Sequence, residues 1–231
     1  MSADRMPSAN FKLLKEQVYE YLREVLRRGD LQPGSVIDID KTSQRLGVSK
    51  TPLHEAILLL EMEGFVSILP RRKVVVNVLS LRDIRHIYDI IGSLESTALL
   101  RAFDLITDAD IEMLARLTAD MKEAIERDDF DLYQEKNLAF HNFILNSSEN
   151  NLLIKAVNMF KKRLDEFPPQ PSWIKEWEKS SLAEHVELVR LIRLRNRKRA
   201  VAYLRDVHWS YEVQEKFIVK YYTNTLPAAK G

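Results

Sequence analysis

The sequence predicts a mainly α-helical protein with two domains: an N-terminal winged helix-turn-helix and a C-terminal all-α antiparallel bundle. Three observations support this fold class. Two short helical stretches flank a tight turn near residue 47, two β-rich runs follow around a basic tip, and only helical periods remain after residue 79. We therefore expect one domain over residues 1–79 and another over residues 80–231.

Composition limits the classes of function. The chain has 231 residues, enough for two modest domains, and 30% of them are charged, yet the formal net charge is only +1. A protein without a global basic field must bind nucleic acid through a local patch. The absence of cysteine excludes disulfides and thiolate metal sites, and no apolar run approaches the roughly 20 residues that span a bilayer. We expect a cytoplasmic protein without a membrane partner.

The first predicted helix covers residues 11–28, where apolar side chains recur at helical spacing, and Gly29 ends it. Pro33 and Gly34 then break the chain. Residues 35–38 follow as a short β-rich run. We expect this run to form a third strand beside the later hairpin.

A helix-turn-helix is predicted around Gly47. This glycine can adopt the left-handed conformation that stops a helix, and the side-chain oxygen of Ser49 can cap the next one. Pro52 fits the first turn of that next helix, because the first four N–H groups have no helical partner. Further along, the helix turns an apolar stripe toward a core, formed by Leu53, Ala56, Ile57 and Leu60.

The exposed N-terminal end of this second helix is the first candidate for DNA contact. A bare, polar and slightly positive helix N-terminus suits the major groove, where side chains meet base edges and N–H groups meet phosphate. Residues 65–69 and 73–78 predict a β-hairpin, the wing. We expect Ser49, Lys50, Thr51 and His54 to lie near bases or phosphates, and Arg45, Arg71, Arg72 and Lys73 to lie near the backbone or minor groove.

The remainder of the chain predicts six amphipathic helices joined by short connections. Thr107 is placed to cap the second of them. Short connections favour antiparallel neighbours, and therefore a bundle. The helices are expected near residues 81–103, 107–128, 130–146, 150–166, 178–195 and 197–222.

Three histidines interrupt the apolar stripes of these helices. His141, His185 and His208 each occupy a position that should face the interior. Burying an imidazole without a partner costs about 1–3 kcal/mol, against a total stability of roughly 5–15 kcal/mol. A shared divalent ion would satisfy all three, and Asn137, one turn before His141, would add an oxygen ligand. We therefore predict a metal site, with zinc or nickel as the ion.

Other interpretations of the histidines stay open. Each one alone is readily explained as a hydrogen-bonded core residue, or the three together could bind a ligand directly without metal. A metal-dependent hydrolase is a further alternative, and Glu184 and Asp206 would be the residues to test. We expect no enzyme, because the chain has no H-E-x-x-H pattern, no nucleophile elbow and no phosphate-binding glycine loop. On a helix, an immediate neighbour of a histidine points away from it, so both carboxylates are expected to be solvated or to support the ligands.

The run GVSKTPLHEAILLLEMEGFV resembles the GVSRTPVREAL-x-x-LE-x-EGLV signature of GntR-type bacterial transcription regulators, and the similarity covers roughly residues 11–78. Lys50 and His54 stand where the family usually has arginines, and the basic run at residues 71–73 stands where its wing tip usually has a glycine. Lysine lacks the bidentate fork of arginine, so guanine should be read differently here. The resemblance implies a homodimer on a palindromic double-stranded DNA operator.

Residues 80–222 resemble the FCD effector domain of the FadR subfamily, whose members often hold a metal with a D-x-x-x-H pattern and two later histidines. The matching positions are Asn137, His141, His185 and His208. Asn137 replaces the usual aspartate, which removes a negative charge and should lower metal affinity. Ile91 stands where we expect an arginine in the family. The resemblance implies a small organic acid as effector, bound near the metal.

Overall fold

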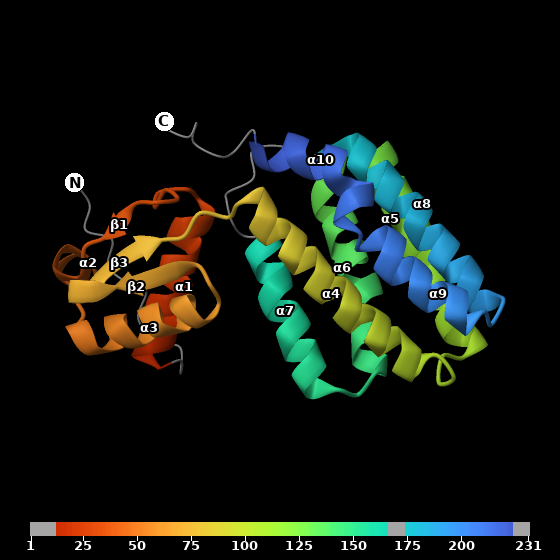
Figure 1. Cartoon of the computed structure of the whole chain (residues 1–231), viewed down its shortest axis with the longest axis horizontal. Coiled ribbons are helices and arrows are strands. Elements are labelled where there is room, and N and C mark those ends of the chain that lie inside the picture. Colours follow the sequence, from red (N-terminus) through yellow and green to blue (C-terminus); the bar gives the residue numbers. More distant parts are fainter. Residues whose placement is uncertain (1–12, 166–173, 224–231) are drawn as a thin grey trace. The chain divides into compact units, whose positions relative to one another are not determined.

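The computed structural model describes residues 13–165 and 174–223 (Figure 1). These residues divide into two compact bodies, one formed by residues 13–80 and 162–165 and one formed by residues 81–161 and 174–223. Within the described part of the chain, no helix combines the length and the apolar character that a membrane span requires.

The first body is a winged helix-turn-helix, which confirms the prediction. It contains the helices α1 (Leu14–Arg27), α2 (Ile39–Leu46) and α3 (Lys50–Met62) and the strands β1 (Val36–Ile37), β2 (Val66–Leu69) and β3 (Lys73–Val76). The strands form an antiparallel sheet in the order β1-β3-β2, with Val36 opposite Val75 and Leu69 opposite Lys73. The expected third strand is therefore β1, and the short turn η1 (Pro70–Arg72) forms the tip of the wing.

The turn between α2 and α3 follows the prediction in one respect and departs from it in another. Gly47 ends α2 in the left-handed conformation, with φ 67°. Ser49 is the N-cap residue of α3, but its side chain makes no capping hydrogen bond, so that expectation was wrong. The usual acceptor geometry targets the N–H of the second or third helical residue, and the third residue here is Pro52, which has no N–H.

The predicted apolar stripe of α3 forms the centre of this body's core. All four members of this stripe are 0% exposed, and α3 packs against α1 and β2. The core residues of this body include Val18, Leu22, Leu26, Leu53, Ala56, Ile57, Leu60, Phe65, Val74 and Val76. This packing fixes α3 and leaves its first turn at the surface.

The second body is all-helical, as predicted. Its elements are α4 (Leu81–Ala102), α5 (Asp108–Glu126), α6 (Phe130–Ser147), α7 (Asn151–Asp165), α8 (Lys175–Arg193), α9 (Arg197–Tyr203), the π-helical turn η2 (Leu204–His208) and α10 (Tyr211–Thr223). α5 packs against α6 and α8, and α4 packs against α6, η2 and α10 (Figure 1). Thr107 caps α5 through a reciprocal capping box with Asp110, as expected.

Two helix boundaries differ from the prediction. The single helix expected over residues 197–222 consists of α9, η2 and α10, because the chain makes a π-helical turn before Trp209 and restarts at Tyr211. α8 begins at Lys175 rather than at residue 178, so Trp177 is helical. The expected end of the fourth bundle helix at residue 166 lies outside the described residues, as do the first two residues of the first predicted helix.

The core of the helical body lies between α4, α5, α6 and α8. Its buried apolar residues come from all of these helices and from α9 and η2. Polar residues buried within the same body are Glu95, Ser96, Thr118, His141, Ser148, Lys161, Glu184, His185, His208 and Gln214. Several of these polar residues form one connected cluster.

Candidate metal and DNA-binding sites

The three predicted histidines meet inside the helical body. His141 comes from α6, His185 from α8 and His208 from η2, and their exposed fractions are 3%, 0% and 9%. The Nε2 atom of His141 lies 3.1 Å from Nε2 of His185 and 3.2 Å from Nε2 of His208. One potential ligand atom from each residue lies within 4.8 Å of the others.

Two buried carboxylates determine which ring nitrogens carry protons. Nδ1 of His141 lies 2.8 Å from Oε2 of Glu95, and Nδ1 of His208 lies 2.8 Å from Oε2 of Glu184. A carboxylate accepts a hydrogen bond, so the N–H of each neutral ring is at Nδ1. The Nε2 atoms of His141 and His208 therefore face each other with lone pairs.

This arrangement suits a cation between the rings. Two lone pairs 3.2 Å apart repel each other, and no proton is left for that contact when both Nδ1 atoms are protonated. Added protons are disfavoured, because burial lowers the pKa of His141 to about 4 and lowers that of His185 well below its usual value. Three neutral imidazole nitrogens are the donors that zinc and nickel prefer. A tetrahedral ion with bonds of about 2.0–2.1 Å holds its ligand nitrogens roughly 3.3 Å apart, close to the spacing found here.

Asn137 remains a candidate for the same site. It lies on α6 one helical turn before His141, and its Oδ1 atom is buried without a hydrogen-bond partner. Buried polar atoms are nearly always paired, so an unpaired one indicates a place for an ion, a water or a ligand. The amide oxygen is a neutral ligand of the kind that can complete a three-histidine set.

Glu95 connects the histidines to a buried cation. Its carboxylate forms an ion pair with Lys161 on α7 and accepts a hydrogen bond of 2.9 Å from Nε1 of Trp209. Burial raises the pKa of Glu95, but the charge interactions with His141 and Lys161 outweigh this effect and hold it below its usual range. Nζ of Lys161 also lies 5.3 Å from the ring centroid of Trp209, a cation–π distance. Glu95 is therefore ionised, and its carboxylate contacts His141, Lys161 and Trp209.

Glu184 connects His208 to other buried polar groups, as Glu95 does for His141. Its second carboxylate oxygen accepts a hydrogen bond of 2.8 Å from Nε2 of Gln214, and Oε1 of Gln214 accepts one of 3.1 Å from Nε1 of Trp177. This chain of contacts ties His208 to α10 and to the start of α8. Asp206, by contrast, is exposed and pairs with Arg205 at the surface.

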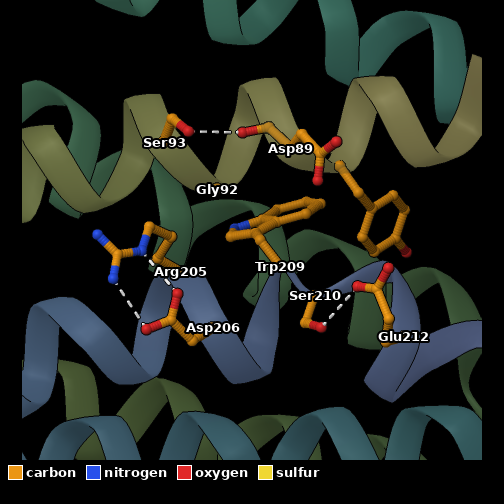
Figure 2. A pocket seen from close by; sticks show the side chains of 9 residues that line it. Asp89, Gly92, Ser93, Arg205, Asp206, Trp209, Ser210 and Glu212 are labelled. Atoms are coloured by element: carbon orange, nitrogen blue, oxygen red, sulfur yellow. Dashed lines mark hydrogen bonds and ion pairs between the residues drawn. The ribbon is translucent and has the colours of Figure 1, made fainter.

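An open groove lies beside the histidine cluster. It has a volume of about 400 Å³, and its lining includes Asp89, Gly92, Arg205 and Trp209 (Figure 2). Figure 2 shows the Trp209 ring between α4 and the segment that carries Arg205 and Ser210. The same ring lies 5.6 Å from the ring of His141 and 5.4 Å from that of His208. Trp209 therefore borders both the groove and the cluster.

Gly92 permits the close approach of α4 to this segment. A Cβ atom at this position would lie 2.9 Å from Cβ of Trp209 and 3.4 Å from its carbonyl oxygen. A side chain at residue 92 would thus push on the residue that follows His208. The absence of a side chain helps to place His208 in the cluster.

The candidate DNA-binding residues lie at the surface of the first body. Arg45, Ser49, Lys50 and Thr51 are exposed, and His54 is partly buried. Lys50 forms an ion pair of 2.5 Å with Asp40, and the guanidinium of Arg45 lies 5.7 Å from the ring centroid of Tyr21. The first turn of α3, which begins with Lys50 and Thr51, is therefore accessible.

The wing tip carries the other candidates. Arg71 and Lys73 are exposed, whereas the side chain of Arg72 lies outside what the structure describes. Arg71 has φ 64°, a left-handed conformation that favours glycine. The strained position therefore presents a cation where a glycine would be the easier choice.

Comparison with known protein families decides the identity. Residues 86–207, more than half of the chain, match the FCD domain, and residues 14–76 match the bacterial regulatory proteins of the gntR family. The chain belongs to the GntR family of transcription regulators. The resemblance of residues 11–78 to GntR regulators and of residues 80–222 to an FCD domain is thereby confirmed, whereas membership of the FadR subfamily stays a prediction.

Individual relatives agree with this assignment. An uncharacterised HTH-type transcriptional regulator of Agrobacterium vitis, from the TAR-I ttuE-ttuC' intergenic region, is 32% identical over 126 residues, which cover 53% of this chain and 74% of the relative. The HTH-type transcriptional repressor RspR of Escherichia coli is 26% identical over 152 residues, which cover 66% and 67% of the two chains. The solved structure of E. coli McbR/YncC aligns with a TM-score of 0.62 at 21% identity, over 93% of this chain and 99% of that one, and so shows the fold.

Family membership also removes the hydrolase alternative. The GntR relatives are transcription regulators rather than enzymes. The geometry agrees, because Glu184, a residue considered as a general base, has both carboxylate oxygens engaged with His208 and Gln214. We therefore describe this GntR protein as a regulator.

Sequence reasoning missed four residues of the regulator's buried cluster: Glu95, Lys161, Trp209 and Gln214. A signal existed for Glu95, because it follows Ile91 by four residues on the buried stripe of α4. Ile91 itself is 0% exposed and apolar, and the cation at this site comes from Lys161 instead. Lys161 and Gln214 reach the cluster from α7 and α10, and no local pattern indicates those contacts.

Proposed function

We propose that this protein is a metal-dependent, homodimeric GntR regulator whose affinity for a DNA operator is controlled by a small organic acid. The observation that carries the proposal is the convergence of three Nε2 atoms, with the Nδ1 atoms of His141 and His208 held by Glu95 and Glu184. The order of Asn137 and the three histidines along the chain supports placement in the FadR subfamily. In this proposal residues 1–79 bind DNA and residues 80–231 bind metal, effector and the second subunit.

His141, His185, His208 and Asn137 would hold the ion, with zinc or nickel as the preferred metals. When bound, the ion supplies an electropositive centre that a carboxylate oxygen can join. Glu95 and Glu184 orient two of the rings and fix their tautomers. The neutral amide of Asn137 contributes an oxygen but no charge.

Charge supports an anionic effector. Glu95 and Glu184 bring two negative charges and Lys161 brings one positive charge, and histidines that bind a metal through Nε2 add none. The cluster by itself thus carries one net negative charge in a buried setting, which favours binding of a cation. A divalent ion would reverse the net charge to a single positive one. A monocarboxylate would then neutralise the site.

Control of DNA binding follows from coupling between the two domains. A dimer would place one α3 helix in each half-site of a palindromic operator, with Ser49, Lys50, Thr51 and His54 at bases or phosphates. The contacts to the DNA backbone or minor groove would come from Arg45, Arg71, Arg72 and Lys73. If the acid favours one arrangement of the dimer by roughly 1–3 kcal/mol, operator affinity changes by about 5- to 150-fold.

A second candidate is a regulator without metal, in which the histidines bind the acid directly. The neutral Asn137 favours it, since a metal site gains affinity from an anionic ligand at this position. In this case His141, His185 or His208 would become protonated when the acid binds. The two candidates make opposite predictions for metal content.

Metal analysis and a gel shift test the proposal together. Purified full-length protein should contain about one transition-metal ion per chain, and His141→Ala should lose it. His86→Ala is the matched control, because His86 is exposed on α4 away from the cluster. Both variants should still retard upstream DNA, and only the wild type and the control should respond to organic acids. Protein that stays metal-free after supplementation but responds to acids would favour the second candidate.

A further inference from the structure

The groove between α4 and residues 205–212 is not part of the proposed metal site. Its volume of about 400 Å³ lies within the usual range of small-molecule sites, roughly 300–1,000 Å³. The lining includes Gly92 on one side and, on the other, Arg205 of the π-helical turn η2 and Trp209 directly after it (Figure 2). π-helical turns are rare and frequently occur at functional sites. The groove is therefore a candidate for a second small-molecule site.

The π-helical turn leaves a backbone acceptor at this groove. In a regular α-helix the N–H of Trp209 would bond to the carbonyl oxygen of Arg205. Here it bonds to the carbonyl of Leu204 at 3.1 Å, and the N–H of the next residue bonds to that of Val207 at 3.3 Å. The carbonyl oxygen of Arg205 lies 3.5 Å from the position that a Cβ atom of Gly92 would occupy, so it lies beside the glycine that lines the groove. Carbonyl oxygens at the C-terminal end of a helix favour cations and N–H donors.

The side chains of the groove carry one negative charge that the described residues do not balance. Three carboxylates and one guanidinium line it, those of Asp89, Asp206, Glu212 and Arg205. Arg205 donates hydrogen bonds of 2.6 and 2.9 Å to Asp206, and Arg85 forms an ion pair with Glu212. Asp89, by contrast, forms no ion pair with any residue in the described part of the chain. The remaining charge suits a ligand with a single positive charge.

Aromatic rings decide between an organic and an inorganic cation. Tyr88 and Trp209 both line the groove, and their ring centroids lie 5.4 Å apart in an edge-to-face arrangement. Aromatic faces attract organic cations, and tryptophan does so best. A calcium or magnesium ion instead requires six or more oxygen ligands, including waters. The combination of rings, one free carboxylate and a carbonyl oxygen therefore favours an organic cation.

We propose that this groove binds a small organic ammonium ion. Its N–H groups donate to the Asp89 carboxylate and to the Arg205 carbonyl oxygen, and its carbon atoms pack against the Trp209 ring. The site goes beyond the proposed function, because neither the metal nor the acid effector is part of it. Trp209 also donates a hydrogen bond of 2.9 Å to Glu95, which binds His141. A ligand in the groove would thus contact a residue that supports the histidine cluster.

Isothermal titration calorimetry on the full-length protein tests the site with three probes that share one carbon chain. Butylammonium has the charge and the N–H groups, butyltrimethylammonium has the charge alone, and 1-butanol has neither the charge nor the nitrogen. The titrations are made at constant ionic strength and near pH ~7, where an alkylamine is protonated. We expect butylammonium to bind about 10-fold more tightly than either of the other probes, the effect of a charge-assisted hydrogen bond.

Two variants assign the binding to the groove. Asp89→Asn should weaken the binding of butylammonium by about 10-fold, because the amide keeps an oxygen but loses the charge. Asp89 is exposed, so this substitution should not disturb the fold. Asp131→Asn, which changes an exposed carboxylate on α6 of the same body, is the matched control and should leave the affinity unchanged.

The outcomes separate this inference from the proposed function. Equal binding of the three probes, or unchanged butylammonium affinity in Asp89→Asn, overturns the ammonium site. Displacement of butylammonium by magnesium chloride at the same ionic strength also overturns it, because the groove would then be a site for an inorganic cation. These results leave the metal content and the response to acids, which test the proposed function, unaffected. Protein that contains no metal but binds butylammonium through Asp89 would overturn the metal site and leave the ammonium site standing.

Discussion

The Nδ1 atom of His141 lies 2.8 Å from Oε2 of Glu95, a carboxylate that is 0% exposed and 46 residues away in the sequence. This single contact fixes the tautomer of the central histidine. It also links the cluster to Lys161 and Trp209, which both bind the same carboxylate. Glu95 is therefore the residue on which the geometry of the cluster depends most.

Glu95→Gln should weaken metal binding by about 10- to 100-fold, the usual effect of losing a carboxylate that orients a metal-bound histidine. It should also destabilise the domain by roughly 3–5 kcal/mol, because the buried Lys161 ammonium loses its partner. A metal-competition titration and urea denaturation measure the two effects. Glu112→Gln, at an exposed ion pair with Arg193, is the control. Unchanged metal affinity would contradict the role assigned to Glu95.

Lys161→Met should leave the metal in place and weaken the binding of anionic acids. The ammonium carries the only positive charge counted within the buried cluster, so its loss reduces the net charge of the loaded site from one positive charge to zero. We expect a loss of roughly 10-fold or more in acid affinity, equal to about 1.4 kcal/mol. Calorimetry with butyrate measures it, and the metal content reports whether the site stays intact. Equal affinity in the variant and the wild type would show that Lys161 does not select for anions.

Gly92→Ala should displace Trp209, because the new Cβ would lie 2.9 Å from the Cβ of that residue. Overpacking of this kind costs about 1–3 kcal/mol. The variant should show a lower Tm and a shifted tryptophan emission spectrum. Ser93→Ala, which removes an exposed hydroxyl bonded to the Asp89 carbonyl, should change neither. A Gly92→Ala protein with wild-type stability and emission would mean that the segment adjusts without cost.

Acid should destabilise the metal-free protein. Burial lowers the pKa of His141 to about 4 and that of His185 well below its usual value, whereas an unfolded histidine titrates near pH ~6.5. Between these values the unfolded chain binds more protons than the folded one. The stabilisation is therefore complete above about pH 6.5 and is lost as the pH falls toward about 4.

Thermal melts between pH 7.5 and 4.5, with a chelator present, measure this effect. Glu178 acts in the opposite direction, because burial raises its pKa to about 7, but it is one group against two histidines. The Tm should therefore fall with pH, and His141→Leu should show a shallower fall. A Tm that rises on acidification would contradict neutral, buried histidines.

Lys73→Ala should reduce DNA affinity about equally for all sequences and lower the slope of log affinity against log salt by about 1, as expected for one lost phosphate contact. Lys73 is exposed at the start of β3 beside the wing tip. Fluorescence anisotropy at several salt concentrations measures both quantities. Lys198→Ala, an exposed lysine of the helical body, is the control. An unchanged salt slope would place Lys73 away from the DNA.

The features that could be predicted from the sequence are those with a local signature. The apolar stripe of α3, the left-handed Gly47 and the capping box at Thr107 each depend on residues within one or two turns, and all three are present. The inward direction of His141 and His185 follows from the same helical period. Such patterns report which face of an element is buried.

Features that depend on contacts between distant elements could not be predicted. Lys161 reaches Glu95 from another helix, and Gln214 reaches Glu184 from α10, so neither contact has a sequence spacing to reveal it. The π-helical turn before Trp209 is a local shift in hydrogen bonding that leaves the apolar period nearly intact. Ser49 makes no cap, and the sequence holds a physical reason, because Pro52 at the third helical position has no N–H to donate.

The most direct test of the account is anomalous diffraction from crystals of the full-length protein, collected above and below the zinc and nickel absorption edges. We predict one strong anomalous peak per chain, located between the Nε2 atoms of His141, His185 and His208. The absence of any such peak in metal-supplemented protein, with the three rings bonded to water or to one another, would contradict the account.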